Sequence, residues 1–165
     1  MEMELHMTQT TKQSILCAVR GQSTSRTTVE HAIELALDSE GELTFMLVLS
    51  TEALARAGPL KAPLRAILKQ LDSIGEFAMS LLEDRARNRG VEDVGFVVKR
   101  GKPAETIRNT ITELQPAIVV LGEPVADEPR AIFSPNQFEH FVTELRQDTE
   151  AEIVVVETPV EDLPK

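Results

Sequence analysis

The sequence predicts an α/β fold, a three-layer sandwich in which helices cover both faces of a parallel sheet. Five short apolar runs alternate along the chain with segments of helical periodicity. These runs are apolar throughout, which is typical of strands that are buried on both faces. Because crossovers between parallel strands are right-handed, this order of elements indicates a doubly wound sheet of five strands.

The chain has the length and the composition of a single globular domain. It comprises 165 residues, of which 42% are hydrophobic and 27% are charged. Both fractions are ordinary for a protein that buries its own core. The first dozen residues show no periodicity. We therefore expect one domain over residues 13–157, with flexible tails at 1–12 and 158–165.

The first half of the chain begins with two predicted strands joined by a helix. Residues 14–19 and 43–49 are the apolar runs that we expect to be strands. The helix between them has apolar residues at helical spacing. Ser23 or Thr24 is predicted to cap its beginning, and Gly41 is predicted to end it.

The longest predicted helix follows a loop or short helix at 53–63 and ends near Gly90. It carries one wide stripe of apolar residues: Leu64, Ile67, Leu68, Leu71, Ile74, Ala78, Leu81 and Leu82. This stripe is wider than the seam of a coiled coil. Packing of the helix on the sheet is therefore favoured over pairing with a partner helix.

The segment from Gly101 to Gly122 is the clearest part of the pattern. It follows a predicted third strand at 94–98 and opens with Gly-Lys-Pro. Pro103 is expected at the first helical position, where a missing N–H costs no hydrogen bond. The helix is predicted to bury Ile107, Ile111 and Leu114. A wholly apolar fourth strand at 117–121 then leads to the glycine.

The last helix is expected after a polar loop at 123–133. Ser134 and Gln137 have the spacing of a capping box, with Pro135 at the first helical position. The buried residues of this helix are predicted to be Phe138, Phe141, Val142 and Leu145. A fifth strand follows at 152–157.

Charge and composition exclude several classes of partner. The formal net charge is −10, with a pI of about 4.8, so the surface would repel nucleic acids and anionic lipids. The chain has no Trp or Tyr on which bases could stack. Its apolar runs are far shorter than the roughly 20 residues that span a bilayer. The N-terminal residues lack the apolar core of a signal peptide, so we expect a cytoplasmic protein.

No pattern of catalytic residues is found. Cys17 is the only cysteine and lies in a predicted buried strand, which favours an inert core thiol over a reactive one. His6, His31 and His140 are far apart in the sequence, so no metal site is expected. The chain has neither a Gly-x-Ser-x-Gly elbow nor a Gly-x4-Gly-Lys-Ser/Thr loop. We predict no catalytic residue.

A ligand crevice is expected at the carboxyl ends of the strands, where the strand order reverses. The candidate ligand-binding residues are Arg20, Gly21, Leu49, Gly122, Glu123, Arg130, Ser134 and Asn136. Arg20 either pairs with Glu123 across the crevice or clamps an anionic ligand, and the first interpretation is favoured. Free N–H groups at the helix start that follows Ser134 are suited to a small anion.

Four segments together resemble the universal stress protein family. They are residues 15–21 before a Ser/Thr-rich helix start, 101–105, 117–122 and the closing run 153–156. The order and spacing of these segments carry the resemblance, which spans about residues 13–157. It implies a sheet of strand order 3-2-1-4-5 and, as in many members, a homodimer.

One branch of that family binds ATP, through an acidic residue after the first strand and a Gly-x2-Gly-x9-Gly-Ser/Thr loop after the fourth. Gly122 matches the first glycine of this loop, but Val125 stands at the second, and Pro135 and Asn136 stand near the last. Arg20 occupies the acidic position. Valine and proline cannot supply the close approach and the N–H groups that phosphates need. We therefore expect no cofactor, ATP included.

In the implied strand order the fifth strand lies at an edge of the sheet. Its apolar residues Ile153, Val154, Val155 and Val156 would favour aggregation there. Pairing with a second copy removes this liability, whereas cover by the tail at 158–165 is the alternative. We expect a non-enzymatic stress-response protein that acts as a homodimer without ATP. The alternative is a sensor that binds ATP, AMP or a small anion through a divergent loop.

Overall fold

The computed structural model describes residues 12–20, 26–50, 61–124 and 133–157. The strands are β1 (Ser14–Val19), β2 (Glu42–Ser50), β3 (Val94–Gly101), β4 (Ile118–Gly122) and β5 (Glu152–Val156). The helices are α1 (Arg26–Ser39), α3 (Lys61–Arg89), α4 (Pro103–Leu114) and α5 (Pro135–Asp148). Ser23, Thr24, the tail at 158–165 and all but the last residue of the tail at 1–12 lie outside the described residues.

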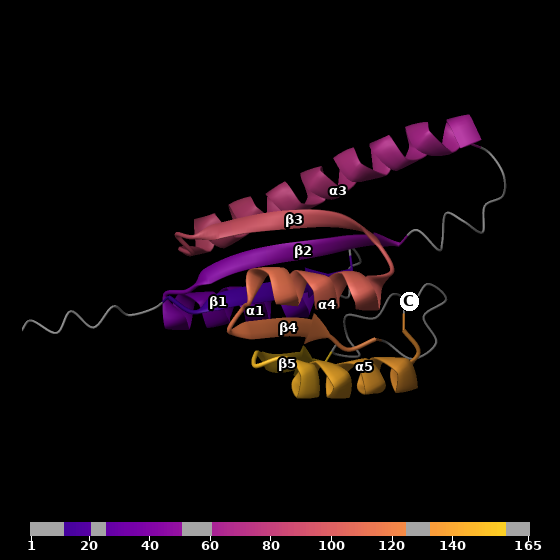
Figure 1. The fold of residues 1–165 in the computed structure, drawn as a ribbon. Coiled ribbons are helices and arrows are strands. Elements are labelled where there is room, and N and C mark those ends of the chain that lie inside the picture. The colour runs from indigo at the N-terminus through magenta and orange to yellow at the C-terminus, as the bar shows by residue number, and fades with distance from the viewer. Residues whose placement is uncertain (1–11, 21–25, 51–60, 125–132, 158–165) are drawn as a thin grey trace, which may run out of the picture.

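The five strands form one parallel sheet of order β3-β2-β1-β4-β5 (Figure 1). This architecture and this order confirm the predicted fold class. Ala18 at the centre of the sheet pairs with Met46 of β2 on one side and with Leu121 of β4 on the other. The two edges of the sheet are therefore β3 and β5.

Two apolar clusters, one on each face of the sheet, form the core. Helices α1 and α3 cover the first face, and α4 and α5 cover the second (Figure 1). Successive residues of β1 point to opposite faces: Cys17 belongs to the first cluster and Leu16 to the second. A strand that serves two cores must be apolar at every position, which explains the uninterrupted runs in the sequence.

The turn from β3 into α4 requires glycine. Gly101 has a φ of +152°, a conformation that residues with a side chain rarely adopt. A Cβ atom at this position would lie 2.5 Å from Thr106 Oγ1. Pro103 stands in the first turn of α4 as predicted, and Gln115 closes the helix in the left-handed conformation. Leu114 was expected in the buried stripe but is 44% exposed, because it is the last residue of the helix.

The predicted apolar stripe of α3 is only partly correct. Ile67, Ile74 and Leu81 are exposed, whereas the fully buried positions are Gly75, Met79 and Ala86. The remaining predicted stripe residues with described side chains, Leu68, Leu71, Ala78 and Leu82, are half-buried.

Gly75 explains this orientation of α3. A Cβ atom at position 75 would lie 3.1 Å from Leu47 of β2 and 3.4 Å from Val98 of β3, so glycine lets the helix approach these strands closely. Among the described residues, the main contacts of α3 with the sheet are made to β3 and β2, next to the β3 edge (Figure 1). Part of its apolar surface consequently remains outside the core.

Candidate functional site

The expected crevice lies at the carboxyl ends of β1 and β4. From β1 the chain continues to β2 on one side, whereas β4 and β5 lie on the other side. This reversal is the position where ligands bind in open α/β sheets. Val19 ends β1 and Gly122 ends β4, so the residues that follow them, Arg20 and Glu123, lie at this end of the sheet.

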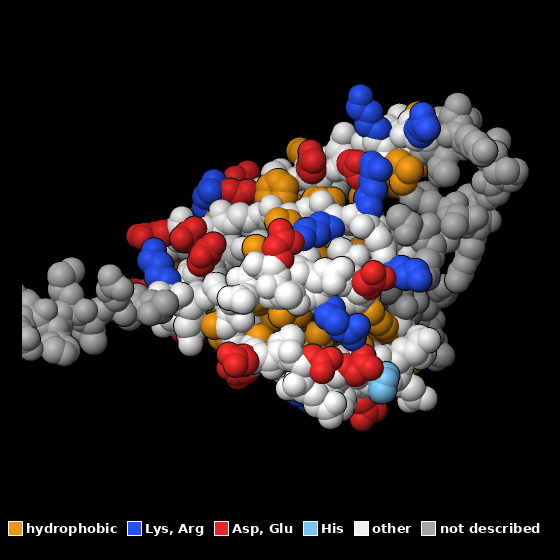
Figure 2. Space-filling view, in the orientation of Figure 1, with side chains coloured by type: hydrophobic (Ala, Val, Ile, Leu, Met, Phe, Trp, Pro, Cys, Tyr) orange, Lys and Arg blue, Asp and Glu red, His pale blue; other side chains and the backbone are white. Residues whose placement is uncertain are grey.

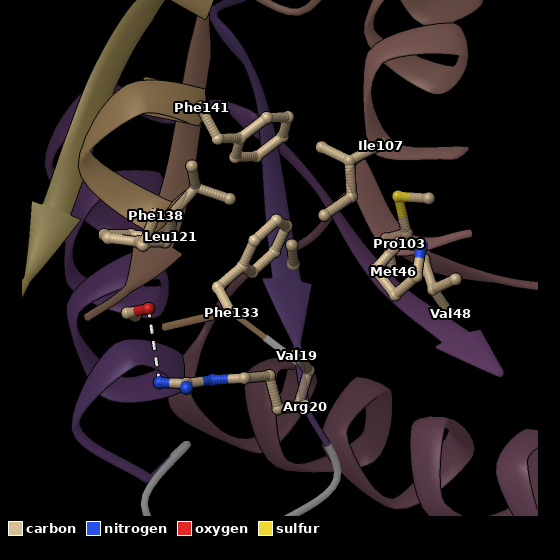
Figure 3. A pocket seen from close by; sticks show the side chains of 12 residues that line it. Val19, Arg20, Met46, Val48, Pro103, Ile107, Leu121, Phe133, Phe138 and Phe141 are labelled. Carbon is tan, nitrogen blue, oxygen red and sulfur yellow. Dashed lines mark hydrogen bonds between the residues drawn. The ribbon is translucent and has the colours of Figure 1, made fainter. Parts of the chain in front are cut away.

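Arg20 bridges the crevice to the end of β4. Its Nη2 donates one hydrogen bond to the carbonyl oxygen of Gly122 at 3.2 Å (Figure 3) and another to that of Glu123 at 2.7 Å. The predicted partner, Glu123, is thus contacted through its main chain, whereas a contact with its carboxylate had been expected. Because the guanidinium is charged, these bonds are stronger than neutral ones. The arrangement fastens the end of β4 to the residue after β1.

Gly122 is explained by packing. A Cβ atom here would lie 2.6 Å from Thr28 Oγ1 of α1 and 3.3 Å from Arg20 Nη2. Thr28 is buried, with 2% of its surface exposed, so it has little room to move. The backbone then continues along β5, because the N–H of Glu123 donates to the carbonyl of Val156 at 2.8 Å. The glycine therefore has a structural role independent of any phosphate.

The start of α5 contains the predicted capping box. Ser134 Oγ accepts from the N–H of Gln137 at 3.3 Å, and the N–H of Ser134 donates to Gln137 Oε1 at 3.0 Å. The N–H of Phe138 donates to the carbonyl of Ser134 at 2.9 Å. The serine side chain and two of the first amides of the helix thus already have partners within the protein, and Asn136 is exposed beside them.

The remaining predicted site residues do not join this group. Leu49 is half-buried and packs on the face covered by α1 and α3, opposite to the pocket described next. Gly21 and Arg130 lie outside the described residues. Among the candidates, the structure brings together Arg20, Gly122 and Glu123.

An apolar pocket adjoins this group on the face covered by α4 and α5. Its volume is about 40 Å³, space for a few water molecules. It is lined by Ala18, Val19, Arg20, Met46, Val48, Pro103, Ile107, Leu121, Gly122, Phe133, Phe138 and Phe141. In Figure 2, apolar side chains reach the surface in the seam between α4 and α5.

Three phenylalanines dominate the pocket. Phe133 stacks on Phe141 with ring centres 5.2 Å apart and meets Phe138 edge-on at 6.2 Å. Its ring lies between Phe141 and Arg20 (Figure 3). Sequence reasoning placed Phe138 and Phe141 in the core but assigned Phe133 to a polar loop. Its place directly before the capping serine was a signal that could have revealed it, because a hydrophobic residue there packs on the fourth residue of the helix, which is Phe138.

A charged pair joins α4 to α5 beside this cluster. Arg108 Nη2 donates to Glu144 Oε2 at 2.8 Å, and the guanidinium carbon lies 5.9 Å from the centre of the Phe141 ring. Arg108 is thus held by both a charge and an aromatic face.

Cys17 lies beneath the crevice in the centre of the sheet and is fully buried. Burial raises the pKa of its thiol to about 12, so the thiol stays protonated at neutral pH and is a poor nucleophile. Within the described residues, no three His, Cys, Asp or Glu side chains lie close enough together to hold a metal ion. No described helix combines the length and the apolar character needed to cross a bilayer.

Replacement of Arg20 by alanine should lower the free energy of unfolding by about 1 kcal/mol, because two charge-assisted hydrogen bonds are lost at a partly exposed site. Urea unfolding measures this change. Arg20→Lys is the matched control, since it keeps the charge but its side chain is one atom too short to place a nitrogen at the position of Nη2, and most of the loss should remain. The loss should be equal with and without added sulfate. A loss seen only when sulfate is present would contradict this structural role.

Comparison with known proteins identifies relatives of this architecture. The profile of the Universal stress protein family matches residues 12–134. No curated protein matches the chain. Among solved structures, universal stress protein UspA from Lactobacillus plantarum is similar with a TM-score of 0.70 and 15% identity, over 88% of this chain and 98% of that one.

Two further similar structures are complexes with nucleotides. One is a universal stress protein in complex with cAMP, with a TM-score of 0.58 and 17% identity over 90% of this chain and 98% of that one. The other is the universal stress protein from Archaeoglobus fulgidus in complex with dAMP, with a TM-score of 0.53 and 12% identity over 87% and 96%. At such identities the likeness concerns the fold.

Proposed function

Because this chain belongs to the universal stress protein family, we propose that it is a non-enzymatic regulatory protein of the stress response, which acts as a homodimer and without bound ATP. Its output is contact with other proteins.

The bridge made by Arg20 is the observation that carries this proposal. A triphosphate site needs backbone N–H groups directed at the ligand. At the end of β4 the carbonyl oxygens of Gly122 and Glu123 are instead directed at Arg20. The Cβ-free side of Gly122, which in a phosphate loop would allow close approach of the ligand, is covered by Thr28. The family's ATP pattern has an acidic residue where this chain has Arg20.

The pocket supports the same proposal. Its lining is apolar except for Arg20 and main-chain atoms, and the Phe133 ring lies between Phe141 and Arg20 (Figure 3). The polar edges and the ribose of a nucleotide would find few hydrogen-bond partners among these side chains.

The homodimer is proposed to form through β5. Ile153 and Val156 are buried within the chain itself. A partner at this edge would therefore contact the main chain of β5 more than these two side chains. The N–H of Glu152 donates to Ala117, and the carbonyl of Val156 accepts from Glu123. Because directions alternate along a strand, the amides of Ile153 and Val155 point to the open edge. A second copy related by a two-fold axis would satisfy them.

A second candidate function is binding of an adenine mononucleotide. The complexes of related proteins with cAMP and dAMP favour it. In this case the base would enter the apolar pocket after movement of Phe133, and Arg20 would leave its carbonyl partners to bind the single phosphate.

Isothermal titration calorimetry distinguishes the two functions. The protein is unfolded, stripped of co-purified ligand and refolded, and is then titrated with ATP, AMP and cAMP in the presence of Mg²⁺. We expect no heat and no thermal shift with any of the three. A dissociation constant in the micromolar range for a monophosphate that is weakened in Arg20→Ala would establish the second function and overturn the first.

A further inference from the structure

Four apolar side chains lie exposed along one side of α3. The exposed fractions are 46% for Ile67, 62% for Ile74, 65% for Phe77 and 53% for Leu81. We call these four residues the α3 stripe. Ile67, Ile74 and Leu81 follow one another at intervals of seven residues, and Phe77 lies three residues after Ile74. This is the spacing of helices that pack against another helix along their length. Figure 2 shows apolar side chains reaching the surface over α3.

The residues beside the stripe suit a close helix partner. Ala66, Ser73 and Ser80 directly precede three of the stripe residues, and such small residues let two helices approach. Both serine hydroxyls already donate within the helix: Ser73 to the carbonyl of Lys69 at 3.1 Å, and Ser80 to that of Phe77 at 2.7 Å. A partner can cover them without leaving a donor unsatisfied.

Two charges next to the stripe indicate what the partner is. Asp72 of α3 pairs with Arg100, Glu83 with Arg87, and Arg85 with Glu30. Lys69 and Asp84, in contrast, form no ion pair with any described residue, and neither does Glu76 between them.

Lys69 and Asp84 lie on the same side of the stripe as the two serines, one near each end. An antiparallel second α3, related by a two-fold axis that passes between Ile74 and Phe77, would set Lys69 beside Asp84 of the partner subunit. The symmetry repeats this contact, so each copy supplies one cation and one anion. In a parallel pair Lys69 and Asp84 would lie at opposite ends of the contact and could not meet.

We propose that the α3 stripe is an interface at which two copies of this chain pair their α3 helices in antiparallel orientation. The proposal is independent of the function proposed above. Helix α3 flanks the β3 edge of the sheet and β5 forms the opposite edge, so the two contacts do not compete. Together they would produce assemblies larger than a dimer.

Sedimentation equilibrium of the full chain tests the interface. Phe77→Glu and, separately, Ile74→Lys should lower the mass of the assembly, because each places a charge in the seam. Both positions are exposed, and circular dichroism should show unchanged helix content. Leu114→Glu on α4 is the matched control, since this leucine is 44% exposed and lies outside the stripe. The assembly of this variant should have the same mass as that of the wild type. Unchanged mass in both stripe variants would overturn the proposal.

The charges test the orientation. Lys69→Glu should raise the dissociation constant of the α3 contact about tenfold, because two attractive pairs become repulsive. Adding Asp84→Lys reverses both signs and should restore the affinity. A double variant that stays as weak as the single one would contradict the antiparallel arrangement.

Val155→Pro separates this interface from the proposed β5 dimer, since it removes an amide that points to the open edge while keeping the bonds to β4. Loss of mass in Phe77→Glu but not in Val155→Pro would support the α3 interface and count against the β5 dimer. The reverse pattern, or a wild type that binds only an unrelated protein at the stripe, would overturn the α3 interface.

Discussion

Gly101→Ala should lower the free energy of unfolding by about 2–4 kcal/mol, one of the two largest effects expected for this chain. Two causes add. The φ of +152° is strained for any residue that carries a Cβ atom, and that atom would lie 2.5 Å from Thr106 Oγ1. Urea unfolding followed by circular dichroism measures the loss.

A second variant separates the two causes. In a Thr106→Ala background the steric contact is gone, so Gly101→Ala should cost less there, and the remaining loss reports the backbone strain alone. Gly95 of the same strand is the matched control, because no atom lies within 4 Å of a Cβ placed on it. Gly95→Ala should be close to neutral. If both alanines behaved alike, the geometry of the β3–α4 turn described here would be wrong.

Phe141→Ala is expected to lower the free energy of unfolding by about 3–5 kcal/mol, because a large buried ring is lost and a cavity remains. Phe141 is 3% exposed, stacks on Phe133 and lies beneath the guanidinium of Arg108. Urea unfolding again provides the measurement. Leu114→Ala, at a half-exposed position, should change the stability by less than about 0.5 kcal/mol.

The Phe141 variant also tests whether Phe133 depends on the cluster. In a double-mutant cycle with Phe133→Ala, the two losses should not add, because the rings stack directly. Strict additivity would mean that the stacked pair contributes nothing to the stability of the pocket.

Most of the fold was predictable because its strands are buried on both faces. Residues 15–19 and 117–121 are apolar at every position, and only a sheet covered by two helical layers requires that. Helix α5 was equally clear, since Ser134 and Gln137 specify the cap through bonds between near neighbours in the sequence. The strand order came from the resemblance to the family, and the pairing of β1 with β2 and β4 confirms it.

The position of the site in the fold was predictable, but most of the residues that line it were not. The reversal of strand order located the crevice, and Arg20 was expected to reach toward Glu123. The aromatic pocket was not foreseen, because it is assembled from β1, β2, β4, α4 and the start of α5. No local pattern reports which of these side chains meet.

The orientation of α3 was missed for a related reason. A helical wheel predicts the buried face from the average direction of all the apolar residues. The face that is actually buried depends on where the helix packs against β2 and β3. Gly75 lets the helix backbone approach β2 and β3 closely, so the side of α3 that carries Gly75 faces the sheet. Ile74, on the predicted stripe, then remains outside.

Because of the position of Cys17, alkylation of its thiol reports when the domain unfolds. A thiol-alkylating reagent requires both access to the sulfur and a thiolate, and the native sheet withholds both. Cys17 pairs with Phe45 on one side and Val120 on the other, so fraying at an edge does not uncover it. The rate of alkylation therefore measures the rate at which the whole domain unfolds. Cys17 is the only thiol in the chain, so no other residue contributes to this rate.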